Sequence, residues 1–101
     1  MSIDLQTKIV TVTPYNVQNS DEVLFINVAG PASVVLPSTG NKYKCNRSFY
    51  IKDFTGLAKT NPITITSAGG KTIDGGTFAI LNGGYAHIQV IYDGTNWKII
   101  S

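Results

Sequence analysis

Acidic and amide side chains at two turns are the first residues of this chain that suggest chemistry. Asp74 precedes two glycines, and Asp93 opens a D-G-T-N sequence that ends at Asn96. Carboxylate and amide oxygens are the ligands that Ca²⁺ prefers. The same side chains also favour turns, because they hydrogen-bond to the backbone two residues further on. We expect the turn role at both places, and we predict no metal and no other cofactor.

The chain has one histidine and one cysteine, and neither lies in a catalytic motif. His87 stands between Ala86 and Ile88, without a neighbouring nucleophile or acid. Cys45 lies among basic residues, which lower the pKa of a thiol, but no catalytic cysteine signature surrounds it. A single cysteine excludes an intrachain disulfide and, with one histidine, a Cys/His zinc site within one chain. An esterase or glycosidase would need a nucleophile–base pair or two facing carboxylates. We therefore predict that the protein is not an enzyme.

Surface residues leave two kinds of binding open. Lys42, Lys44 and Arg47 form a basic cluster, which is either a solvated loop end or a site for an acidic or phosphate-bearing surface. The glycine pairs at 69–70 and 83–84 lead into strands rather than helices, so they are not phosphate-binding loops. Exposed aromatic rings stack on sugars, and the candidates for glycan binding are Tyr15, Tyr43, Tyr50 and Tyr85.

Composition limits the class of partner. The chain has 101 residues, enough for one domain, and its charged fraction of 14% lies below the roughly 25% of typical soluble domains. A net charge of +2 is too small to imply nucleic acid or an anionic membrane as a partner. The first residues lack a basic segment and a long apolar run, so we expect no signal peptide or membrane span. We predict synthesis in a reducing cytoplasm.

Short alternating apolar runs separated by Gly, Pro, Asn and Asp predict an all-β protein without helices. The closing D-G-T-N-W sequence predicts a hairpin with a positive φ at Gly94 and a buried Trp97. We expect an antiparallel β-sandwich or jelly-roll-like fold of about eight strands. Residues 1–20 are expected to form an N-terminal arm and the first strand, and 21–101 the sandwich module of a single domain. The predicted strands are 8–13, 22–28, 32–36, 47–53, 62–66, 77–81, 85–92 and 96–100, with a possible short strand at 71–73 and loops at 37–46 and 54–61.

Two of these strands are apolar on both faces. In strand 22–28, Val23 and Phe25 lie on one side and Leu24 and Ile26 on the other. A small two-layer domain buries only one face of each sheet, so the other face needs cover. A partner subunit is the cover that we favour, and a fold-back of the 37–46 loop or the N-terminal segment is the alternative. The candidate residues of this interface are Leu24, Ile26, Val28, His87, Gln89 and Ile91.

The order of motifs from Asp21 onward resembles a module of tailed-bacteriophage virion proteins. The motifs are VLFINVAGPASVVLP, RSFYIKDFTG, NPITITSAGGKTIDGG and YAHIQVIYDGTNWKII, and together they cover about four-fifths of the chain. The resemblance implies a compact β-sandwich or jelly-roll-like fold that assembles as a homotrimer. Such modules occur in tail fibres, tail-needle tips and capsid decoration (cement) proteins, and they carry no enzyme active site.

Only about twenty residues precede the module, without coiled-coil heptads, which favours a decoration protein over a fibre tip. The expected partners are further copies of the chain and the major capsid protein of a phage head, on the surface of the virion. A receptor- or glycan-binding tip of a tail fibre or needle is the alternative. The candidate capsid contacts are the arm, where Ile3 and Leu5 suit strand addition to a neighbour, and the basic residues Lys42, Lys44 and Arg47.

Overall fold

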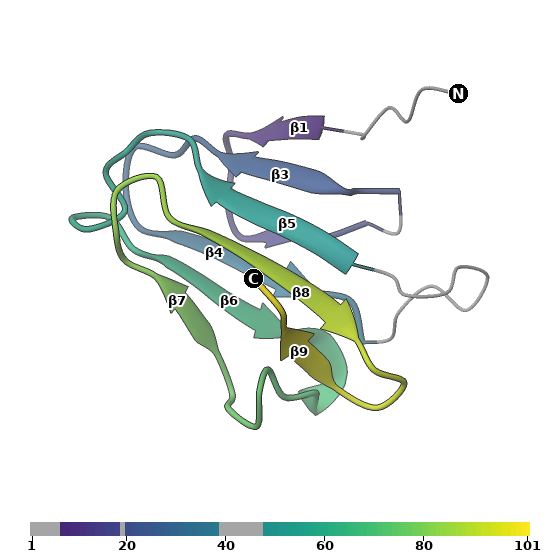
Figure 1. The fold of residues 1–101 in the computed structure, drawn as a ribbon. Coiled ribbons are helices and arrows are strands. Elements are labelled where there is room, and N and C mark those ends of the chain that lie inside the picture. The colour runs from purple at the N-terminus through teal and green to yellow at the C-terminus, as the bar shows by residue number, and fades with distance from the viewer. Residues whose placement is uncertain (1–6, 19, 39–47) are drawn as a thin grey trace.

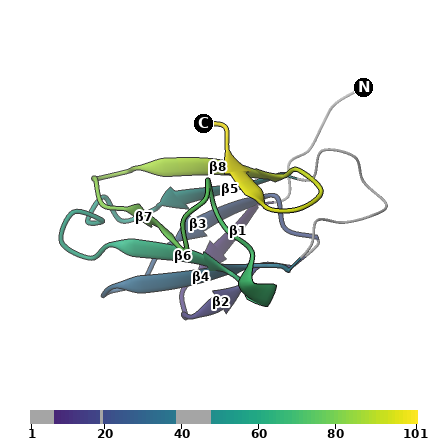
Figure 2. The same ribbon diagram turned by 90° about the horizontal axis from the view of Figure 1, so that it is seen from below.

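A computed structural model describes residues 7–18, 20–38 and 48–101, and these residues form two β-sheets packed as layers (Figures 1 and 2). The five-stranded sheet has the order β1-β3-β5-β8-β9, and the four-stranded sheet has the order β2-β4-β6-β7. The strands are β1 (Thr7–Val10), β2 (Tyr15–Asn16), β3 (Val23–Ile26), β4 (Ala32–Leu36), β5 (Ser48–Asp53), β6 (Ile63–Ser67), β7 (Ala79–Leu81), β8 (His87–Tyr92) and β9 (Trp97–Ile99).

The chain passes from one sheet to the other after each of its first strands. β1, β3 and β5 therefore lie parallel in one sheet, and β2, β4 and β6 lie parallel in the other. β7, β8 and β9 then close the two sheets with antiparallel pairs. The prediction of an antiparallel sandwich is wrong for the first six strands, and a jelly roll, which is antiparallel, does not describe their pairing. Alternation of apolar residues marks a strand and its faces, but it carries no information on the direction of the neighbouring strand.

The core lies between the sheets and consists of the inward half of each alternating strand. Leu24, Phe49 and Ile51 of the five-stranded sheet and Val34 and Ile65 of the other sheet are fully buried. Burying a side chain of this size stabilises the fold by roughly 1.5–3 kcal/mol. The core thus accounts for the period-two pattern of the sequence.

Trp97 closes one side of this core, as predicted. Its side chain is 0% exposed, its indole Nε1 donates to the carbonyl oxygen of Pro37 at 3.1 Å, and its ring centroid lies 5.7 Å from that of Phe49. Gly94 has a φ of +102°, which confirms the predicted turn before Trp97. The last hairpin is therefore part of the core structure and not a loose tail.

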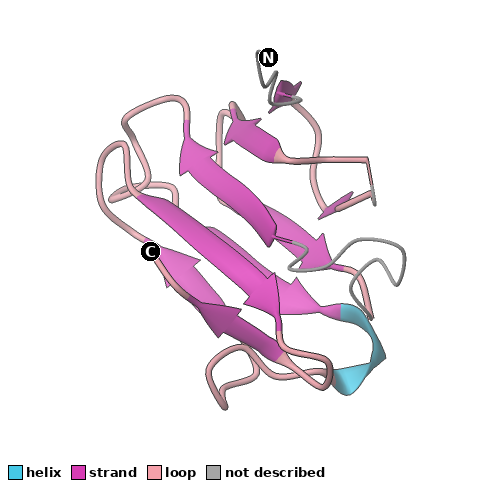
Figure 3. Ribbon diagram, turned by 45° about the vertical axis from the view of Figure 1, so that its right-hand side comes forward, coloured by secondary structure: helices cyan, strands magenta, loops and turns pink. Residues whose placement is uncertain are grey.

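Most predicted strands are present within a few residues of their expected bounds. Ile73 makes isolated bridges to Gly76 and Trp97, in the segment predicted as a possible short strand. β2 is not among the predicted strands, because two residues give no periodicity. A single 3-10 turn at Ala68–Gly70 is the one helical element among the described residues (Figure 3). The all-β class and the layered arrangement are confirmed.

Candidate interaction surface

The outward face of the five-stranded sheet is rich in apolar side chains. The register places Ile9, Phe25, Lys52 and His87 side by side across β1, β3, β5 and β8. A second row contains Thr7, Val23, Tyr50 and Gln89. Ile9 is 51% exposed, whereas the next residue, Val10, points to the other side of the sheet and is buried. We call this surface the outer face of the five-stranded sheet.

A depression lies in this outer face, across β3, β5 and β8. Its volume is about 230 Å³, and it is lined by Val23, Tyr50, Lys52 and His87. The outward strand positions of the described residues include the cationic Lys52 but no carboxylate. The depression thus joins an aromatic ring and aliphatic groups to positive charge.

The structure divides the predicted trimer-interface residues between opposite sides of this sheet. Leu24 and Ile26 are buried in the core of the same chain, and Val28 packs against that core. This assignment is therefore corrected: on β3 the outward residues are Val23 and Phe25. The sequence did not distinguish the two sides, because both are apolar. On β8 the prediction named the outward side: Ile88 and Val90 are buried and Tyr92 packs against the core, whereas the alternate positions His87, Gln89 and Ile91 face outward.

The outward face of the four-stranded sheet has a different chemistry. The register aligns Ser33, Thr64 and Ile80 in one row, and Val35 with Thr66 in the next. Three of the six outward strand positions carry hydroxyl groups, the others are Asn16, Val35 and Ile80, and no charged side chain occupies an outward strand position of the described residues. Threonine on an open sheet face is well hydrated and needs no cover. The two outer faces are thus chemically unlike.

A buried carboxylate at the end of β5 was missed by the sequence analysis. Asp53 is 1% exposed and accepts hydrogen bonds from the Thr55 hydroxyl at 2.8 Å, and from the backbone N–H groups of Thr55, Ala58 and Tyr85 at 3.0–3.1 Å. Burial alone would raise the pKa of Asp53, but these hydrogen bonds outweigh it and hold the pKa below its usual value. The only sequence signal was the local D-x-T spacing, since Tyr85 is far away along the chain.

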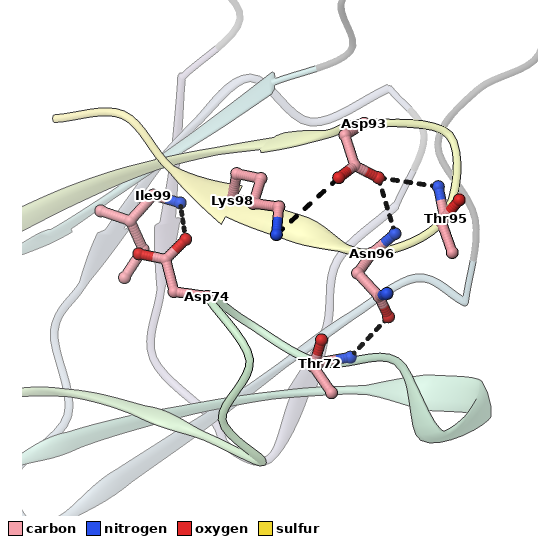
Figure 4. A network of polar contacts seen from close by, with 7 residues as sticks. All are labelled: Thr72, Asp74, Asp93, Thr95, Asn96, Lys98 and Ile99. Atoms are coloured by element: carbon pink, nitrogen blue, oxygen red, sulfur yellow. Dashed lines mark hydrogen bonds and ion pairs between the residues drawn. The ribbon is translucent and has the colours of Figure 1, made fainter.

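The carboxylates that suggested a Ca²⁺ site are occupied by backbone N–H groups (Figure 4). Asp93 Oδ1 accepts from Thr95 and Asn96 at 2.8 Å, and Asp74 Oδ1 accepts from Ile99 at 3.0 Å. The two N–H groups, together with nearby Lys98, hold the pKa of Asp93 below its usual value. The Asp93 contacts are the turn role that the sequence predicted, whereas the Asp74 side chain binds the distant strand β9 instead of its own turn. In the described part of the chain, no three His, Cys, Asp or Glu residues gather in a group suited to a metal ion.

The tyrosines considered for glycan binding lie in different environments. The Tyr15 hydroxyl donates to Asp21 at 2.6 Å, and burial together with this bond raises the pKa of Tyr15. Tyr50 and Tyr85 are exposed. The remaining candidates lie outside the described residues: Tyr43, Cys45, the arm residues Ile3 and Leu5, and the basic residues Lys42, Lys44 and Arg47.

Within the described segments, the structure contains no helix that is long and apolar enough to span a membrane. No family model matches the chain, and no curated protein matches it in sequence.

Proposed function

We propose that this chain is a structural virion protein: a homotrimeric decoration protein that binds the outside of a phage head and stabilises it. The observation that carries the proposal is the apolar outer face of the five-stranded sheet, where Ile9, Phe25 and Tyr50 face outward. The order of sequence motifs from Asp21 onward supplies the virion context and the trimer.

Self-association is favoured because the outward face of the five-stranded sheet carries apolar side chains, as its buried inward face does. Ile9, Val23 and Phe25 alternate with core residues, so β1 and β3 are as apolar outside as inside. Removing apolar surface from water stabilises an interface by roughly 25 cal/mol per Å². Further copies of the chain are available wherever the chain itself is present. In a closed symmetric trimer, the outer face of each copy is covered in the same way.

Binding to the head then relies on multivalency. Three weak footprints on one trimer act as one tight contact, because the second and third binding events are intramolecular. The predicted contacts are the arm, through Ile3 and Leu5, and the basic residues Lys42, Lys44 and Arg47. The partner would be the major capsid protein, and the location would be the virion surface.

The experiment measures the oligomeric state of the chain and its binding to phage heads. The purified chain and its Phe25→Glu variant are sedimented to obtain their masses, and both are mixed with phage heads that lack the protein. We expect the native chain to be a trimer that occupies the heads. The Phe25→Glu variant should be a folded monomer with much lower occupancy. A native chain that binds no heads would contradict the decoration role, and a native monomer would contradict the trimer.

A receptor-binding tip is the second candidate, and the depression on the outer face favours it. The Tyr50 ring offers a stacking surface, and Lys52 and His87 offer polar groups beside it. In that case the outer face would bind an acidic glycan on the host surface instead of a second copy. Binding of the chain to host cells, lost on Tyr50→Ala, would favour this role over decoration.

A further inference from the structure

Several connections of the sandwich gather at one end of the molecule. The β3–β4, β5–β6 and β7–β8 connections lie together at the left-hand end in Figure 1. The register requires this, because β3 and β5 end side by side at Ile26 and Asp53, and β8 begins opposite Lys52. Three large apolar side chains are exposed here, and we call them the loop-end cluster: Phe54 at 45%, Leu57 at 56% and Tyr85 at 60%.

The loop-end cluster is held in place by a buried polar network. The Asp53 carboxylate binds N–H groups of Ala58 and Tyr85, so one buried group ties two loops together. Lys52 Nζ donates to the Tyr85 carbonyl oxygen at 2.7 Å, and its ammonium lies 5.8 Å from the centre of the Tyr85 ring. The exposed side chains therefore project from fixed backbone.

Close backbone packing reinforces this arrangement. Gly56 has a φ of +79°, and a Cβ at this position would lie 2.7 Å from the Tyr85 ring. A Cβ on Gly84 would lie 2.9 Å from the Gly56 carbonyl oxygen. A side chain at Gly84 would require movement of the loop backbone, and one at Gly56 would displace the Tyr85 ring and strain a backbone with positive φ. A surface that is already fixed loses less conformational entropy when it binds.

Charge is distributed unevenly between the two ends of the sandwich. Lys59 is exposed at the loop end, where the Lys52 ammonium is already bound to the Tyr85 carbonyl oxygen, and the Asp53 carboxylate there is buried and fully used by hydrogen bonds. The exposed carboxylates of the described residues, Asp74 and Asp93, lie beside β9 at the opposite end. The loop end therefore presents apolar side chains flanked by uncompensated positive charge.

We propose that the loop-end cluster is a docking site for an acidic, apolar segment of a partner protein. This inference rests on the proposed function and deepens it, because it names the described surface with which the oligomer attaches to the virion. Phe54, Leu57 and Tyr85 contact the apolar side chains of the segment. Lys59 pairs with its carboxylates, which makes the attachment weaken as salt rises.

The exposed residue types favour a protein partner over a glycan. Leu57 is among the most exposed side chains of the cluster, and it can neither stack on a sugar ring nor hydrogen-bond to it. Apolar aliphatic and aromatic groups around a fixed centre are typical of protein interfaces. A glycan is therefore the competing outcome of the test.

The test uses the native oligomer, phage heads and phage tails that lack the protein, and host cells. Leu57→Ser and Lys59→Glu change the loop end. Ile80→Ser on the other sheet and Lys71→Glu are the matched controls, with the same chemical changes elsewhere. Mass by sedimentation, melting temperature, and occupancy at low and high salt are measured for every variant.

We expect Leu57→Ser and Lys59→Glu to keep the native mass and melting temperature and to lose at least about tenfold in particle binding, because three sites act together. Lys59→Glu should also reduce the salt dependence, whereas both controls should bind as the native chain does. Equal binding by the loop-end variants would overturn this inference and leave the decoration role standing. A native chain that binds neither heads nor tails would overturn both, and binding only to host cells that glycosidase abolishes would identify a glycan site instead.

Discussion

The two outer faces of this sandwich are built from the same alternating strands but differ in side-chain chemistry. The outer face of the five-stranded sheet presents Ile9 and Phe25, whereas the outer face of the four-stranded sheet presents Thr64 and Thr66. Both sheets bury Val, Ile and Leu on the inside. Folding alone needs only the inner faces to be apolar, so the apolar residues of the outer face call for a different explanation, which the proposed self-association would supply.

Trp97 lies in the core between the two sheets, and its loss should have the largest effect on stability. Replacing it by Ala should lower the free energy of unfolding by roughly 3–5 kcal/mol, because a large cavity opens beside Phe49. Trp97→Phe is the milder control and should retain part of the packing. Chemical denaturation measures both, and an unchanged midpoint for Trp97→Ala would refute the account of the closing hairpin.

A matched pair of charge insertions tests the comparison between the faces. Phe25→Glu should weaken self-association by at least about 100-fold, since taking a carboxylate out of water at the interface costs several kcal/mol, which the neighbouring Lys52 offsets only in part. Thr64→Glu, the same change on the other sheet, should leave the mass unchanged. Sedimentation of both variants at several concentrations provides the measurement. Dissociation by Thr64→Glu, without dissociation by Phe25→Glu, would show that the interface lies on the four-stranded sheet instead.

Acid should weaken the loop end before it affects the outer faces. Because the pKa of Asp53 is lower in the folded chain than in the unfolded chain, its contribution is present above about pH 3.9 and is lost as pH falls through the folded value. Asp53→Asn should cost about 2 kcal/mol at neutral pH, since an amide cannot accept all four hydrogen bonds. The variant should also lose less stability than the native chain between pH 5 and about pH 2. A parallel decline of both chains in acid would contradict the assigned role of Asp53.

The smallest expected effect compares two exposed isoleucines. Ile9→Ser on the five-stranded sheet and Ile80→Ser on the four-stranded sheet should each change the unfolding of the monomer by less than about 0.5 kcal/mol. Only Ile9→Ser should weaken self-association, by about tenfold. Equal effects of the two substitutions on the mass distribution would remove the distinction between the faces.

The strands could be predicted from sequence because their signal is local. Ile63 and Ile65 alternate with threonines, and Gly94 marks a turn that needs a positive φ. Strand direction could not be predicted in this way. β3 pairs in parallel with β5 across a gap of more than twenty residues, and no local pattern encodes such a pairing.

The candidate surface was predictable only in part for related reasons. On β8 the outward residues include His87 and Gln89, so polarity marked that side. On β3 both sides are apolar, and only the sheet pairing shows that Leu24 faces inward. Asp53 gave almost no local signal, because one of its hydrogen-bond donors is Tyr85, which the fold brings from 32 residues away.

Sedimentation equilibrium of the native chain is the most direct test of the central claim that the outer face of the five-stranded sheet is covered by further copies of the chain. The account predicts a single species of three times the chain mass of 10.9 kDa at micromolar concentration. A well-folded species with the mass of one chain over the same concentrations would contradict it.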